Sequence, residues 1–170
     1  MIISESFDHI HQLLKACKFD DAYSVLIDVK TGRLNSAYKW DANHAWYCVG
    51  LAEFDRLNYY KAANAFRRAY KYNTKDILSL LALGDCYDEM KRPKFAERYF
   101  REALKKNPKG EDRAALLFNL GNALFDQHKY SEALDFFRKV SRRSGETGEK
   151  ARKNLKRVKL LCLESGNLRQ

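Results

Sequence analysis

The residues of this 170-residue chain that most readily bind metal ions or take part in catalysis are four histidines and four cysteines. His9 and His11 lie two residues apart, so on a helix they point to different faces. The cysteines are widely spaced, which is typical of reduced thiols rather than of a disulfide framework or a zinc site. We therefore expect no metal site and no cofactor among these residues: His9, His11, His44, His128, Cys17, Cys48, Cys86 and Cys162.

The sequence contains none of the catalytic motifs that can be recognised by spacing. It has no phosphate-binding loop of the GxxxxGK type and no HExxH zinc motif. Carboxylates such as Glu53 and Asp88 are interpreted as solvated or groove-lining side chains rather than as an acid–base pair. The sequence therefore predicts a protein that is not an enzyme.

The positive charge of the chain is concentrated near its C-terminus. The formal net charge is +10, but residues 1–137 hold 21 basic and 19 acidic side chains, whereas residues 138–170 hold 11 and 3. No run approaches the length of about 18 apolar residues that a membrane span needs, and the start of the chain lacks a secretory signal. With reduced thiols, these features predict a cytoplasmic protein without a membrane span.

The elements that must position any functional residue are pairs of short helices. Residues 77–110 read as two amphipathic helices, with Leu80, Leu83 and Gly84 on one stripe of the first. Pro108 then ends the pair, because proline has no N–H to continue a helix. Tyr87 completes the first stripe, and the second helix carries Ala96, Phe100 and Ala103.

The same pattern recurs 34 residues earlier, at Gly50 and Phe66, and 37 residues later, at Gly121 and Phe137. A helix–turn–helix repeat of about 34 residues resembles the tetratricopeptide family. The resemblance implies an all-α fold, a right-handed α-solenoid of stacked antiparallel helix pairs. Mid-helix glycine costs about 1 kcal/mol against alanine, so we expect Gly50, Gly84 and Gly121 to lie where a neighbouring helix approaches closely. We expect the large rings of Phe66, Phe100 and Phe137 to fill the space between successive helix pairs.

The repeats imply one domain over residues 1–170. Residues 3–29 read as a degenerate first unit, whose second helix carries Phe19, Ala22, Leu26 and Val29. Residues 30–42 form a longer connection, in which Tyr38 and Trp40 are either binding residues or, as we expect because aromatics bury large apolar areas, cover the edge of the core. Three clear repeats follow at 43–76, 77–110 and 114–147, and a break at 144–148 precedes a capping helix at 149–164.

In proteins that this chain resembles, first helices line a concave face that receives an extended or helical segment of a partner. Aromatic residues recur there, off the core stripe, although they would also serve as padding between helices or lie under a terminal segment. The positions expected in this groove are His44, Tyr47, Leu51, Phe54, Leu78, Leu81, Asp85, Asp88, Ala115, Phe118, Asn122 and Phe125.

The groove departs from the lysine, arginine and asparagine clamp by which one subclass of the family holds acidic chaperone tails. Leu81 and Phe118 stand where lysines would be needed, and Asp85 and Asp88 would repel a carboxylate. We therefore predict a scaffold, adaptor or chaperone-like module for an apolar or aromatic protein segment that carries some positive charge.

The last helix allows two other functions. Its basic residues would bind nucleic acid or another anionic surface, or they would simply form the solvated face of a cap. Leu160, Leu161 and Leu163 exceed what one apolar stripe requires, which allows self-association. The basic residues are Lys150, Arg152, Lys153, Lys156, Arg157 and Lys159.

Overall fold

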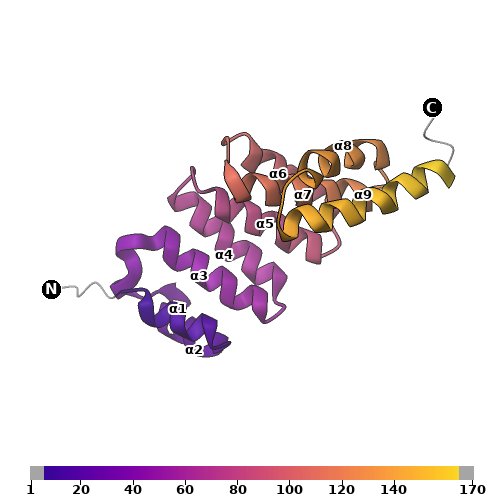
Figure 1. Ribbon diagram of the computed structural model, residues 1–170. Coiled ribbons are helices and arrows are strands. Elements are labelled where there is room, and N and C mark those ends of the chain that lie inside the picture. Colours follow the sequence, from indigo (N-terminus) through magenta and orange to yellow (C-terminus); the bar gives the residue numbers. More distant parts are fainter. Residues whose placement is uncertain (1–5, 165–170) are drawn as a thin grey trace. The chain divides into compact units, whose positions relative to one another are not determined.

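Helices form almost all the secondary structure of the computed structural model, which describes residues 6–164 (Figure 1). The start of the expected degenerate unit, residues 3–5, lies outside the described residues. The chain divides into two compact units, the N-terminal unit of residues 1–90 and the C-terminal unit of residues 91–170. The all-α class expected from the repeats is confirmed in both.

In the N-terminal unit, helices that follow one another in the chain pack side by side, which is the arrangement of an α-solenoid. The turn between α3 and α4 spans only residues 56–58, so these two helices run antiparallel. The described elements are α1 (Asp8–Lys15), α2 (Phe19–Leu26), β1 (Ile27–Asp28), β2 (Arg33–Leu34), the 3₁₀-helix η1 (Ser36–Asp41), α3 (Ala42–Asp55), α4 (Tyr59–Tyr72) and α5 (Ile77–Glu89).

The C-terminal unit follows the same plan with fewer elements. Its described helices are α6 (Pro93–Leu104), α7 (Gly110–Asp126), α8 (Tyr130–Ser141) and α9 (Glu146–Glu164). Each packs on the next, and α9 also touches α7. Helix α9 begins at Glu146, inside the stretch where the sequence predicts a break, and the break itself is confined to residues 142–145. Ala151, Val158 and Cys162 bury the apolar stripe of α9.

The mid-helix glycines make the close contacts that the repeat predicts. A Cβ atom on Gly50 would overlap the buried ring of Phe66, and one on Gly121 would lie 2.7 Å from the ring of Phe137. Gly84 is buried as well. Glycine is therefore required where the first helix of a pair meets the phenylalanine of the second.

The turns inside the helix pairs are closed by backbone geometry rather than by glycine. Between α3 and α4, Leu57 has a φ of 63°, its N–H donates to the carbonyl of Phe54, and the N–H of Asn58 donates to the carbonyl of Glu53. This is a Schellman motif with leucine at the left-handed position where glycine is usual. Cys17 and His128 occupy the same place in the α1–α2 and α7–α8 turns.

The expected connection at 30–42 contains structure that the sequence did not predict. Strands β1 and β2 pair antiparallel, Ile27 opposite Leu34, around a turn in which Asp28 accepts hydrogen bonds from two backbone N–H groups. Helix α2 ends at Leu26, so Val29 lies in this turn and is 76% exposed instead of belonging to the helix stripe. Tyr38 is buried as expected, whereas Trp40 is 60% exposed.

Candidate protein-interaction surface

Helix α3 presents three of the predicted groove residues with one side packed and one side open. The Tyr47 ring lies 5.4 Å from that of Phe66, and the Phe54 ring lies 5.2 Å from that of Tyr59. Both rings, like Leu51, remain half-buried. These aromatics therefore contribute to the α3–α4 contact and also leave apolar surface available to a partner.

Helix α5, which like α3 packs on α4, carries four more of the predicted groove residues. Leu78 is 45% exposed, and Leu81 is half-buried. Asp85 and Asp88 follow on the same helix, one and two turns further on, and both are half-buried. A segment lying along α5 would therefore meet leucine side chains first and negative charge towards the C-terminal end of the helix.

His44, also expected in the groove, is turned towards α1. Its ring meets that of Phe7 edge-on at 4.5 Å, and its Nε2 atom lies 2.9 Å from Nε2 of His11. The Sγ atom of Cys48, one turn along α3, is 3.6 Å from the same His44 nitrogen. His44 is thus part of an α1–α3 side-chain cluster.

The C-terminal unit holds three further residues predicted for the groove, Phe118, Asn122 and Phe125. Its last helix, α9, contacts two of them, Asn122 and Phe125. Asn154 of α9 donates a hydrogen bond of 2.8 Å to Asn122, and the Arg157 guanidinium lies 4.8 Å from the ring centroid of Phe125. Phe118 packs against Phe137 with ring centroids 5.9 Å apart. Asn122 and Phe125 therefore match the alternative in which such residues lie under a terminal segment.

Three of the six residues of the predicted basic patch on α9 make contacts within the chain. Lys150 forms an ion pair with Glu146, Arg152 donates to the carbonyls of Ser141 and Arg143, and Arg157 lies over Phe125. Among the described residues, no ion pair involves the exposed side chains of Lys153, Lys156 and Lys159. Leu160 and Leu163 are 61% and 65% exposed, and Leu161 is half-buried.

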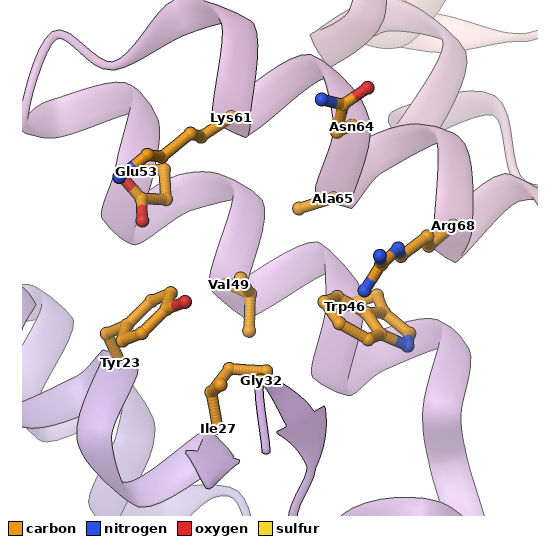
Figure 2. A pocket seen from close by; sticks show the side chains of 10 residues that line it. All are labelled: Tyr23, Ile27, Gly32, Trp46, Val49, Glu53, Lys61, Asn64, Ala65 and Arg68. Atoms are coloured by element: carbon orange, nitrogen blue, oxygen red, sulfur yellow. The ribbon is translucent and has the colours of Figure 1, made fainter. Parts of the chain in front are cut away.

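A pocket of about 200 Å³ lies between α2, the β1–β2 turn, α3 and α4 (Figure 2). Figure 2 shows Arg68 reaching from α4 over Trp46 of α3, with the guanidinium carbon 4.4 Å from the ring centroid. Sequence reasoning missed this pocket, because its lining residues come from three helices and from the β1–β2 turn, which the repeat pattern does not predict. The lining residues are Tyr23, Ile27, Gly32, Trp46, Val49, Glu53, Lys61, Asn64, Ala65 and Arg68.

Glu53 is the most deeply buried charged group of that pocket, at 3% exposure. It accepts a hydrogen bond of 2.8 Å from Asn58, and Arg56 lies 3.7 Å away while also pairing with Asp20. Because its oxygens already have partners, Glu53 serves to hold the α3–α4 turn rather than to exchange a proton with a ligand.

No helix in the described part of the chain combines the length and apolar character needed to cross a membrane.

Comparison with known proteins identifies the repeats. Models of the tetratricopeptide repeat match residues 78–109 and 114–145. No curated protein matches the chain. A solved structure titled "MamA MSR-1 C2" shares the fold with a TM-score of 0.61 at 19% identity, over 79% of this chain and 72% of that one.

Proposed function

Because this chain belongs to the tetratricopeptide repeat family, whose members generally serve as non-enzymatic protein-interaction modules, we propose that it holds a segment of a partner protein against α3 and α5. The observation that carries the proposal is the run of partly exposed apolar side chains on these two helices, which flank α4. Aromatic and leucine side chains of this kind form the energetic centre of many protein interfaces.

The partner segment is expected to be apolar or aromatic and to carry some positive charge. Leu78 and Leu81 supply apolar contacts, and Asp85 and Asp88 add negative charge on the same helix. An acidic chaperone tail is disfavoured, because two unit charges repel by about 1 kcal/mol at 4 Å in water and by more in a desolvated site.

We restrict the proposal to the N-terminal unit. In the C-terminal unit, α9 already contacts Asn122 and Phe125, so a partner would have to displace Asn154 and Arg157 to reach them. In the N-terminal unit, Tyr47 and Phe54 pack against Phe66 and Tyr59 of α4, and both side chains remain half-buried, so part of each ring is open to solvent.

Selection from a random displayed-peptide library, with the purified chain as bait, tests this proposal. We expect the enriched peptides to combine aromatic or leucine residues with lysine or arginine. Tyr47→Ala and Leu81→Ser should each weaken binding of the selected peptides about tenfold or more, as central interface residues do.

Tyr60→Ala is the matched control, because Tyr60 lies on α4 and is 73% exposed. It should leave binding unchanged, and circular dichroism should show that all variants keep their helicity. If Tyr47→Ala binds the peptides as well as the unmodified chain does, the partner segment does not lie along α3.

A further inference from the structure

Three side chains that can bind metal ions converge where α1 packs on α3. His44 and Cys48 are four residues apart and share one face of α3, and His11 reaches them from α1. His44 Nε2 lies 2.9 Å from His11 Nε2 and 3.6 Å from Cys48 Sγ. The three potential donor atoms all lie within 4.8 Å of one another.

These separations approach those of ligand atoms around a single tetrahedral ion. Bonds of about 2.0–2.1 Å to nitrogen and about 2.3 Å to sulfur place neighbouring ligand atoms roughly 3.3–3.6 Å apart. The His44–Cys48 distance already has this value, and the two histidine nitrogens would need to separate by about 0.4 Å. The donor atoms of His11 and Cys48 lie within 4.8 Å of each other, so a movement of the His11 ring would bring this third distance into range. His11 lies on the more exposed side, so small movements of its ring are open to it.

The donor set selects the kind of ion. Two imidazoles and one thiolate suit Zn²⁺ and its neighbours, whereas Mg²⁺ and Ca²⁺ require oxygen ligands. We propose that His11, His44 and Cys48 form a binding site for a thiophilic first-row transition ion of the Zn²⁺ class, with solvent in the fourth position. This inference does not rest on the proposed partner site.

The surroundings of the cluster fit a cation. Phe7 stacks beside His11 and meets His44 edge-on, so its ring lies against both imidazoles. Asp41 accepts a hydrogen bond from the backbone N–H of His44, and its negative charge acts on both His44 and Cys48. A cation bound by the two imidazoles would therefore also be stabilised by the negative charge of Asp41.

Binding would exchange protons for the ion. Burial, and then the charge of Asp41, raise the pKa of the Cys48 thiol to about 12, so the free site holds a neutral thiol. Formation of the metal–sulfur bond breaks the S–H bond and releases that proton to solvent. Each imidazole would bind through the lone pair of Nε2 and carry its own proton on Nδ1.

Co²⁺, used as a coloured substitute for Zn²⁺, tests the site in the full chain after reduction and removal of metals. We expect one Co²⁺ per chain, an absorption band for charge transfer from thiolate to metal, and loss of that band when Zn²⁺ is added. His11→Gln, His44→Gln and Cys48→Ser should each abolish the band or weaken binding at least about tenfold, because even residues that merely support ligands matter that much.

His9→Gln and Cys17→Ser are matched controls, since both side chains are exposed and lie at or near the same helix as His11. They should bind Co²⁺ with the same band and affinity as the unmodified chain. Binding without a thiolate band, or equal binding in the Cys48→Ser variant, would overturn the proposal. If that variant fails to fold, His11→Gln decides the question alone, because it removes a side chain at the surface.

Discussion

At the scale of single residues, glycine and phenylalanine at fixed offsets carry most of the information about the fold. Gly50 and Gly121 were predicted as close-contact positions from the repeat alone, and each lies against the phenylalanine of its own unit. The His11–His44–Cys48 cluster was missed, because motif searches look for ligands close together in sequence. His11 and His44 are 33 residues apart, about one repeat, which brings equivalent first helices together.

Replacing Gly50 by alanine tests this contact. Alanine favours a helix by about 1 kcal/mol, but forcing a methyl group into a packed core costs about 1–3 kcal/mol. Phe66 is 1% exposed and cannot move aside, so we expect a net loss of roughly 1–2 kcal/mol in the free energy of unfolding, measured with urea. Adding Phe66→Leu should recover part of it. A Gly50→Ala chain as stable as the original would contradict the assigned contact.

At the scale of elements, helix type and pairing were predictable from apolar periodicity, but local connections and helix orientation were not. The β1–β2 pair involves two residues on each strand, too few to produce an alternating pattern. The left-handed Leu57 carries no glycine signal. The apolar stripe of α9 was predicted, but periodicity does not say which neighbour it covers, and so the contacts to Asn122 and Phe125 were not assigned.

Glu97 joins three helices of the C-terminal unit. Its carboxylate accepts hydrogen bonds from Arg101 on α6, from Gln127 at the end of α7, and from Lys129 just before α8, at 2.7, 2.8 and 3.0 Å. Burial raises the pKa of Glu97, but these three donors outweigh burial and lower the pKa below its usual value of 4.5. The charged carboxylate is therefore the form that the folded unit prefers.

We expect this network to make stability depend on acid. Because the folded pKa lies below the unfolded value, the stabilisation is fully present above about pH 4.5 and is lost as pH falls through the folded pKa. Glu97→Gln should lower the free energy of unfolding at pH 7 by about 1–2 kcal/mol. Below pH 4.5, the free energy of unfolding of this variant should decrease less steeply with falling pH than that of the unmodified chain. Urea titrations at pH 7, 4.5 and 3 measure both effects.

Glu149→Gln, at an exposed site on α9, removes the same charge without touching the network and is the control for this experiment. It should leave the acid dependence close to that of the unmodified chain. If Glu97→Gln and Glu149→Gln behave alike, the three hydrogen bonds do not stabilise the folded unit.

At the scale of the whole molecule, net charge can be counted from the sequence, and the structure then shows which charged side chains already have partners. The excess of positive charge over residues 138–170 predicted a basic helix, and α9 is that helix. Lys150, Arg152 and Arg157 make contacts within the chain, whereas no ion pair in the described part of the chain involves the exposed Lys153, Lys156 and Lys159. Three lysines are a small site for a nucleic acid.

Filter binding of mixed-sequence duplex DNA at two salt concentrations measures this site. If three phosphates are neutralised, raising salt from about 50 to about 200 mM should weaken binding roughly forty-fold. Changing Lys153, Lys156 and Lys159 to Gln should remove the binding, whereas the same change at exposed Lys30, Lys39 and Lys61 should not. The absence of binding at low salt would exclude a nucleic-acid function for α9.

The side-by-side packing of successive helices also bears on how each unit forms from the unfolded chain. Within each unit, the main helix contacts join neighbours in sequence, with α1–α3 and α7–α9 the longest steps between described helices. Such short loops cost little entropy to close, and helical proteins rich in local contacts reach their native state in about microseconds to milliseconds. Folding can therefore begin at any helix pair of a unit and propagate to the neighbouring pair. During synthesis, the first helix pairs can fold before the last helices have been made.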